Sequence, residues 1–544
     1  MLHFKKKIMK KDLLKRRLTK TLGVGILLLA TQACTDLEIE ATDSIIQSDG
    51  FAGVEDIQGE ITNISNIVAG GDLGNQDGLY ALNEVSTDEY VVATRGTDWG
   101  DNGRWLAIHR HSWNAELQDV VRCWQNLNSV TLNATLILNE QSTNTSSGDV
   151  TQLKAQASFY RAWAMHWILD MYRQVPFRDV DLPNSAIPEV LTGQAALDFI
   201  ISDLNDAIAG LPTVSAGNDI ESKSSPTKAA ANHLLAKIHL NKHIYLGTAP
   251  DAADMQVVIN AVDAIAADGY GLAASGDFFD IFRPSNDVET LWWSPADAGP
   301  RIWPTLHYNL NSPGNSGGGW NGFATLSEFY ELFEGDPDTN YVGDGQEERR
   351  GWVPDPATAN EDNLGIGYGF LIGQQFEQDG TPLAARDNVD GVPLVFTKEV
   401  SKAEYTAPAD NAVLETDGTR MLKYHPNEEG GDRRTHIVKY RFADSYLMRA
   451  EAMFRMGTDV TAMINELRST RGASMLSGVQ EADLLAERGR EMYAETTRRQ
   501  DLIRFGQYTR AWNLKEAGNP DLEIFPIPIA DVLANPNLQQ NPGY

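Results

Sequence analysis

Residues 153–171 read LKAQASFYRAWAMHWILDM, and this stretch decides the fold class. Its apolar residues recur at spacings of 4, 3, 4, 3 and 4, at Leu153, Ala157, Tyr160, Ala164, Trp167 and Met171. That spacing places them on one face of an α-helix. The pattern therefore predicts a long buried helix that ends before Pro176.

Helices of the same kind are predicted along much of the chain. They cover residues 200–211, 227–246, 255–267, 437–456, 459–472 and 480–504. The second of them should begin with Ser225 as N-cap and Pro226 as its first residue. Helices joined by short connectors favour pairs that resemble tetratricopeptide-type hairpins. We therefore expect a mainly α-helical fold.

The N-terminal region has the pattern of a secretory signal. A basic stretch, Lys5 to Lys20, precedes the short apolar run Leu22 to Ala30, and Cys34 follows. That run is too short for a transmembrane helix, which needs ~20 apolar residues. The segment resembles a bacterial lipoprotein signal, which predicts a signal peptide at 1–33 and lipidation of Cys34. The acidic residues 35–40 resemble a Bacteroidetes surface-export signal. The alternative is an ordinary cleavage site beside a cysteine.

Charge and cysteine content exclude some functions. The chain of 544 residues has a formal charge of −30, and residues 1–33 hold nine Lys or Arg and one Asp, so their removal gives −38. A chain this acidic is a poor nucleic-acid binder. Once Cys34 is lipidated only Cys123 remains, so no internal disulfide can form. We expect Cys123 to be a small buried apolar residue.

Two loop-like stretches, 92–124 and 292–325, hold eight of the twelve tryptophans, and a third irregular stretch is expected at 355–435. Long loops in a helical scaffold are usually functional. Sugar rings stack on aromatic rings, and their hydroxyls pair with Asp, Asn and Arg, so these loops predict an oligosaccharide site. Its candidate residues are Arg95, Asp98, Trp99, Asn102, Trp303, Trp320 and Asn321. The alternative for Trp99 and Trp320 is a loop anchor packed against the helices.

The other tryptophans are expected to be structural. Trp292 and Trp293 should split, one ring inward and one outward, if residues 289–294 are extended. A core position is predicted for Trp105, Trp113, Trp124, Trp163 and Trp167.

Several motifs in chain order point to a known family. The chain ends in IFPIPIADVLANPNLQQNPGY at 524–544, and it carries TKAAA at 227–231, YRFAD at 440–444, LMRAEA at 447–452 and ERGRE at 487–491. With the helix at 153–163, these motifs resemble the SusD/RagB family of nutrient-binding outer-membrane lipoproteins. The resemblance implies a tetratricopeptide-like helix-pair core with large irregular loop excursions that carry the ligand site.

The same resemblance implies partners and a location. The partners are a SusC-like TonB-dependent outer-membrane transporter, an oligosaccharide ligand and outer-membrane lipid through the N-terminal anchor, with no cofactor and no nucleic acid. The protein would sit at the cell outer membrane, lipid-anchored and facing outward. Its regions would be the signal peptide 1–33, an N-terminal helical region 34–270 and a C-terminal region 271–544. The last of these would contain loop excursions at 292–435 and closing helices at 437–506.

Most charged residues in these motifs are predicted to form interhelical ion pairs or caps. They are Arg441, Asp444, Glu451, Glu487, Arg490, Glu491 and Asp501. Each lies on an apolar-faced helix, where an unpaired charge would be costly.

Signals for catalysis and metal binding are weak. The chain has no Gly-x-Ser-x-Gly, His-Glu-x-x-His or P-loop motif. His109 and His111 have no third ligand at conventional spacing. The acidic loop 336–347 has Tyr341 where a calcium loop needs Gly. We therefore expect a glycan-binding protein and not an enzyme. The alternatives are a peptide-binding RagB-like protein, a surface glycoside hydrolase and a scaffold that binds only protein.

Overall fold

The structure is a computed structural model that describes residues 53–544. Its description excludes residues 97, 184, 313–314, 316–317, 386–391, 405–414 and 428–435. The predicted signal peptide 1–33 and the predicted lipidation site Cys34 lie outside the described residues. The described residues belong to one compact unit, Ala52–Tyr544. The predicted division at residue 270 stays a prediction.

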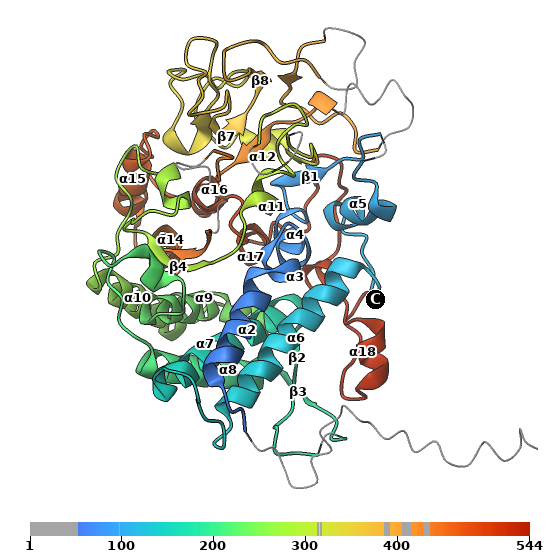
Figure 1. The fold of residues 1–544 in the computed structure, drawn as a ribbon, viewed down its shortest axis with the longest axis vertical. Helices are drawn as coiled ribbons and strands as arrows, with labels where there is room; N and C mark the ends of the chain where they lie inside the picture. The colour runs from blue at the N-terminus through green and yellow to red at the C-terminus, as the bar shows by residue number, and fades with distance from the viewer. Residues whose placement is uncertain are drawn as a thin grey trace, which may run out of the picture. The chain divides into compact units, whose positions relative to one another are not determined.

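Long helices form the core of this unit, and several of them are predicted by the apolar periodicity (Figure 1). In the first half of the chain they are α2 (Ile57–Ala69), α6 (Gln118–Leu138), α7 (Val150–Tyr172), α8 (Gly193–Gly210), α9 (Lys228–Leu246) and α10 (Ala252–Ala267). Each helix from α6 to α10 packs against the next one in the chain. The predicted mainly α-helical fold with a helix-pair core is confirmed.

The second half of the chain adds helices to the same core. They are α14 (Phe442–Arg455), α15 (Thr461–Thr470), α16 (Glu481–Met492) and α17 (Arg498–Arg504). Because α14 packs against α9 and α10, both halves of the chain contribute to one core. Short helices complete the set: α3 (Gly71–Gly74), α4 (Gly78–Glu84), α5 (Arg104–His109), α11 (Gly299–Ile302), α12 (Ser327–Tyr330) and α18 (Ile529–Ala534).

Short strands connect the loops to the helices. They form five antiparallel sheets among the described residues: β1 (Tyr90–Val92) with β5 (Phe323–Thr325); β6 (Gly351–Trp352), β7 (Tyr368–Leu371) and β10 (Arg420–Leu422); β4 (Thr290–Ser294) with β11 (Ile437–Arg441); β2 (Gln174–Phe177) with β3 (Glu189–Thr192); and β8 (Gly373–Gln374) with β9 (Val395–Phe396). In Figure 1 the loop segment with β7 and β8 lies at the end of the unit opposite α7 and α8.

Two predicted helix starts are wrong. Helix α9 is capped by Thr227, whose hydroxyl accepts the N–H of Ala230 at 3.2 Å, so Pro226 precedes the helix. The helix predicted at 437–456 begins as strand β11, which pairs with β4, and becomes helical only at Phe442. In the second case the apolar pattern continues through the boundary and does not mark it.

Two other predicted segments also differ. The helix predicted at 480–504 is broken into α16 and α17, because Ala494 and Thr496 have left-handed φ angles of 58° and 63°. The stretch 92–124, predicted as a loop, contains α5 and the first turns of α6.

The predicted strand at 289–294 is present, but the predicted split of its tryptophans is wrong. Trp292 packs edge-on against Phe159 at 5.2 Å and against Tyr440 at 5.3 Å. Trp293 stacks on His436 and donates its indole N–H to the carbonyl of Ile220 at 2.7 Å. Both rings are buried because both faces of the β4–β11 pair are covered.

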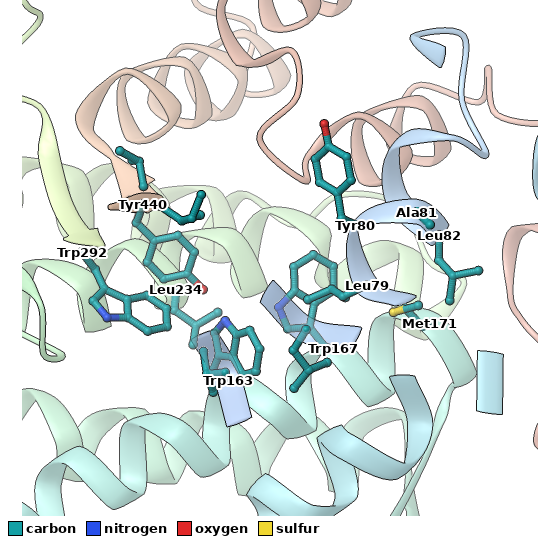
Figure 2. Close-up of a cluster of buried hydrophobic side chains, with 14 of the residues drawn as sticks. Leu79, Tyr80, Ala81, Leu82, Trp163, Trp167, Met171, Leu234, Trp292 and Tyr440 are labelled. Carbon is teal, nitrogen blue, oxygen red and sulfur yellow. The ribbon is translucent and has the colours of Figure 1, made fainter. Parts of the chain in front are cut away.

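The core between the helices is rich in aromatic rings (Figure 2). Trp167 of α7 lies beside Leu79 of α4, and Trp163 of the same helix contacts Trp292, which packs against Tyr440. The tryptophans expected to be structural are confirmed as buried: Trp105, Trp113, Trp124, Trp163 and Trp167. Cys123 is buried too, as predicted, and burial raises the pKa of its thiol.

A buried network of ion pairs joins the C-terminal helices to the loops. Arg441 contacts Glu289 at 2.9 Å and Glu491 at 2.8 Å, while Arg471 contacts the same two carboxylates. Arg349 links Glu487 to Glu491. The predicted ion-pairing role is confirmed for all seven motif residues: Arg441, Asp444, Glu451, Glu487, Arg490, Glu491 and Asp501.

Candidate ligand-binding site

The first wall of the site is a tight turn after strand β1. The backbone of Arg95 and that of Asp98 exchange two hydrogen bonds of 2.9 Å, and Gly96 has a φ of 61°. The chain then passes through Trp99 and Asn102, whose φ angles of 60° and 54° are left-handed. Such backbone is costly for residues other than Gly and is enriched at functional sites. This turn holds the Trp99 ring against the second wall.

The second wall is built by two segments that run side by side. The N–H of Trp320 donates to the carbonyl of Trp303 at 2.6 Å, and the N–H of Asn321 donates to the carbonyl of Leu306 at 2.7 Å. Gly322 continues this pairing with the carbonyl of Pro304. Strand β5 follows at once and pairs with β1, which brings the two walls together.

Three indole rings form a row across the two walls. The ring centroids of Trp303 and Trp320 are 5.3 Å apart at an interplanar angle of 51°. Those of Trp320 and Trp99 are 6.5 Å apart at 44°. All three rings are partly exposed, whereas Trp105 and Phe323 beneath Trp99 are buried. We call Trp99, Trp303 and Trp320 the tryptophan row.

The row is fixed in place by its backbone. The indole N–H of Trp99 donates to the carbonyl of Trp320 at 2.7 Å. A Cβ at Gly322 would lie 2.2 Å from the Trp99 ring, so this position admits only glycine with the ring as it stands. The indole N–H groups of Trp303 and Trp320 have no acceptor among the described residues. They are therefore available to a ligand.

The polar candidates lie in different environments. Asp98 accepts a hydrogen bond from the hydroxyl of Tyr308 at 2.7 Å. Asn102 is exposed at the rim and makes no side-chain hydrogen bond within the described residues. Asn321 is fully buried, and its amide oxygen accepts from Arg420 at 2.8 Å while its amide nitrogen donates to the carbonyl of Glu415 at 3.1 Å. Asn321 thus has its amide engaged inside the second wall.

Arg95 is the most unusual of the candidates. Its side chain is 3% exposed, and its three guanidinium nitrogens have no hydrogen-bond partner within the described part of the chain. Burial lowers the pKa of Arg95 to about 10, and the nearby Tyr308, Asp417 and Glu415 oppose that shift. The structure thus gathers all seven candidates around the row, with Arg95 and Asn321 beneath its surface. Their roles in binding stay predictions.

The sequence did not single out three residues that shape the site. Tyr308 orients Asp98, Phe323 supports the Trp99 ring at 5.8 Å, and Asp101 accepts the indole N–H of Trp105 at 2.6 Å. All three lie within the two tryptophan-rich stretches, so a search of those loops for further aromatic and acidic residues would have found them.

The described residues were predicted to hold no metal site, and none is found among them. They contain no group of three or more His, Cys, Asp or Glu that could hold a metal ion. His109 has both ring nitrogens on backbone carbonyls, those of Tyr90 and Asn513. In the acidic loop 336–347, Glu347 is buried against Arg349. No helix in the described part of the chain is long and apolar enough to cross a membrane.

Sequence profiles of two known groups match the chain. The profile of the SusD family matches residues 289–544. A second profile, described as starch-binding associating with outer membrane, matches residues 42–240. The chain belongs to the SusD family. The descriptions of the second profile and of the relative SusD name starch binding, and that of the profile also names association with the outer membrane.

Individual relatives span nearly the whole chain. The starch-binding protein SusD of Bacteroides thetaiotaomicron is 24% identical over 534 residues, which cover 89% of this chain and 90% of that protein. A SusD-like protein of Bacteroides fragilis has a similar solved structure, with a TM-score of 0.66, 17% identity and coverage of 90% and 96%. A laminarin-binding SusD-like protein gives a TM-score of 0.62 at 18% identity, with coverage of 90% and 100%. The solved structures therefore share the SusD fold.

Proposed function

We propose that this SusD-family protein is a cell-surface lipoprotein that captures oligosaccharide on the tryptophan row and delivers it to a SusC-like TonB-dependent transporter. The observation that carries the proposal is the row itself: three partly exposed indoles in contact, two of them with N–H donors that have no acceptor among the described residues. Aromatic faces of this kind are costly to leave exposed without a ligand.

The row suits the chemistry of a sugar chain. The faces of sugar rings carry C–H groups that stack on indole, and their hydroxyls would accept hydrogen bonds from Trp303 and Trp320. Asp98 and the exposed Asn102 lie in the same turn as Trp99 and would pair with further hydroxyls. Arg95 and Asn321 would act by positioning the walls and not by contact.

The angles in the row favour a curved chain over a flat one. A flat, ribbon-like glycan would stack best on coplanar rings. Here each ring is rotated relative to its neighbour, by 51° between Trp303 and Trp320 and by 44° between Trp320 and Trp99. A glycan whose backbone bends from one sugar to the next would meet these rings in turn. The proposed ligand is therefore an oligosaccharide with a curved backbone.

The proposed location and partner rest on the N-terminal sequence and the family. The basic stretch, short apolar run and Cys34 fit a lipid anchor on the outer membrane, and the acidic residues that follow fit export to the cell surface. The profile matched by residues 42–240 describes proteins that associate with the outer membrane. A surface-anchored binder needs an outer-membrane transporter to take up its ligand, and a SusC-like receptor is the proposed one.

The test is affinity electrophoresis and calorimetry of residues 35–544 against a panel of polysaccharides. Trp99→Ala and Trp320→Ala are compared with Leu533→Ala, which changes an exposed side chain on α18. Each row variant should weaken binding about 10-fold while remaining folded, because each removes one ring contact. Binding of peptides but of no glycan, or glycan binding whose affinity and stoichiometry both row substitutions together leave unchanged, would refute the proposed site.

A further inference from the structure

A large open cleft lies in another part of the protein and shares no residue with the tryptophan row. Its volume is about 1220 Å³. One wall is the segment 272–288, and the other is formed by Trp352, residues 360–368 and His425. Most of its lining residues are polar or aromatic, so the cleft is suited to a hydrated ligand more than to an apolar one.

An aromatic stack forms one side of this cleft. Tyr368 lies between Phe279 and His425, with centroid distances of 4.9 Å and 4.7 Å. Its hydroxyl accepts a hydrogen bond from Arg283 at 2.5 Å, and the guanidinium of Arg283 sits 5.6 Å from the ring centroid. These contacts hold Tyr368 rigidly, and the ring is 8% exposed. Tyr368 therefore supports the neighbouring ring and offers little surface of its own.

That neighbouring ring is Trp352. It pairs with Tyr368 across strands β6 and β7, and the two ring centroids are 6.2 Å apart at 60°. Trp352 is partly exposed, and its indole N–H has no acceptor within the described part of the chain. Trp303 and Trp320 of the row share both properties. A rigidly backed, accessible indole with a free donor is a ready platform for a sugar ring.

Polar groups face the same space. The carboxylates of Asp277 and Asp362 make no hydrogen bond within the described residues. Asn286 uses its amide oxygen to accept the N–H of Ile220 at 2.8 Å, which leaves its NH₂ group available. Acceptors and donors of this kind pair with neighbouring hydroxyls of a sugar.

The wall that carries Asp362 is rigid. The side chain of Asn360 accepts the N–H groups of Asp362 and Asn363 at 2.9 and 3.0 Å. The amide of Asn363 in turn donates to the carbonyl of Thr358 and accepts the N–H of Gly365, both at 2.9 Å. A preorganised wall lowers the entropy lost on binding.

The charge of the cleft selects among glycans. Asp277, Asp280, Asp287 and Asp362 all line it, and the one arginine among its described lining residues, Arg283, is paired with Asp280 at 3.1 Å. An acidic sugar or an acidic peptide would be repelled by this excess of carboxylates. A neutral sugar carries no such penalty.

We propose that this cleft is a second glycan-binding site, for neutral oligosaccharides, with Trp352 as its stacking platform. The site does not depend on the tryptophan row. The two are nevertheless linked by backbone pairing: β6 and β7 join β10, and Thr419 just before β10 pairs with Thr325 of β5, the strand that follows Trp320. A long glycan bound at both places would gain avidity over a short one.

The test uses residues 35–544 with Trp99→Ala and Trp320→Ala combined, which removes the row, and three neutral probes: maltohexaose, laminarihexaose and cellohexaose. Calorimetry should detect binding of at least one probe to this row-deficient protein. Adding Trp352→Ala should weaken that binding about 10-fold, and Trp352→Phe should retain most of it, because the ring remains. Oligogalacturonate, the acidic control, should not bind the row-deficient protein.

Three results would overturn the second site. One is a row-deficient protein that is folded, by its thermal transition, but binds none of the three neutral probes. Another is binding that Trp352→Ala leaves unchanged. The third is peptide binding, measured with a casein digest, that Trp352→Ala abolishes while glycan binding persists. Glycan binding that persists without the row and still depends on Trp352 would show that this site acts independently of the proposed function of the row.

Discussion

The indole N–H of Trp99 donates to the backbone carbonyl of Trp320, 2.7 Å away and 221 residues along the chain. This single contact joins the two loops that carry the tryptophan row. The row is therefore assembled before any ligand arrives, and the entropy of ordering its rings is paid during folding. A change that breaks this contact should weaken glycan binding even when every ring of the row is still present.

Trp99→Phe tests that relationship. Phenylalanine keeps an aromatic ring but has no N–H, so the Trp320 carbonyl loses a donor at a cost of about 1 kcal/mol. We expect weaker glycan binding by calorimetry together with a small fall in the melting temperature. Trp293→Phe is the matched control, because the Trp293 indole also donates to a backbone carbonyl at 2.7 Å, but in the core. It should lower stability by a similar amount and leave affinity unchanged. Equal affinity losses in both variants would argue against a specific role for the contact.

Gly322→Ala should disturb the same ring from the other side. Its Cβ would stand 2.2 Å from Trp99, so the indole must move or the wall must open, at about 1–3 kcal/mol of overpacking. We expect a large loss of affinity and a changed tryptophan fluorescence spectrum in a protein that still folds. Gly217→Ala has no atom within 4 Å of the added Cβ and should have no effect on either. Unchanged fluorescence and affinity in Gly322→Ala would mean that the ring has other space to occupy.

The sequence predicts the helical core well because helix periodicity is local. The six apolar positions of α7 from Leu153 to Met171 can be read from their spacing and are all buried, although burial extends around most of the helix. Local apolar spacing could not identify β11 as a strand. Its residues Ile437–Arg441 fit a helix or a strand equally, and what decides is pairing with β4, about 150 residues earlier. The break after α16 has no Gly or Pro to mark it. It depends on Glu84 and Glu89, which accept the N–H groups of Thr496 and Ala494.

The site was predicted to the level of its loops and residue types. Tryptophans in long loops locate the row because exposed aromatic rings are rare without a function. Which polar side chains are free could not be predicted, because it depends on partners far along the chain. The amide oxygen of Asn321 accepts a hydrogen bond from Arg420, and the side chain of Arg95 is buried. In the sequence, Asn321 and Arg95 both look like surface residues of a Gly-rich loop. Trp352 stood outside the tryptophan-rich stretches, so its exposed position became visible only in the structure.

Glu491→Gln should destabilise the protein without changing the affinity of the folded fraction. Glu491 contacts Arg441 at 2.8 Å, Arg471 at 3.0 Å and Arg349 at 3.2 Å, and all of these side chains are buried. Removing its charge leaves three arginines under-compensated, at a cost of about 3–5 kcal/mol. Glu404→Gln is the control, since Glu404 pairs with Arg110 on the surface. This substitution should lower the free energy of unfolding by less than about 1 kcal/mol. Denaturant unfolding measures both, and equal midpoints would refute the structural role of the network.

The stability of the protein should fall on both sides of a mildly acidic optimum. Glu451 and Glu487 face arginines that lower the pKa of each carboxyl to about 2, from an ordinary value of 4.5. Burial opposes that shift without reversing it. Their ion pairs stabilise the folded state fully above pH 4.5, and this contribution is lost as the pH falls toward 2.

Glu84 and Glu89 give the opposite dependence of stability on pH. Both are buried, they share a hydrogen bond, and each accepts a backbone N–H from the turn between α16 and α17. Burial raises the pKa of Glu89 to about 7 and that of Glu84 well above its ordinary value. Their protonated forms stabilise the fold below pH 4.5, and that contribution is lost as the pH rises through 7.

Glu89→Gln isolates this second effect. The glutamine is neutral at every pH, can still accept the N–H of Ala494 through its amide oxygen and can donate to Glu84 through its NH₂ group. As the pH rises from 4.5 to above 7, we expect the melting temperature of Glu89→Gln to fall less than that of the unaltered protein. Glu404→Gln, on the surface, should follow the unaltered protein throughout. Parallel curves for Glu89→Gln and the unaltered protein would mean that Glu89 is ionised in the folded state at neutral pH. The turn would then be held by a carboxylate and not by a protonated pair.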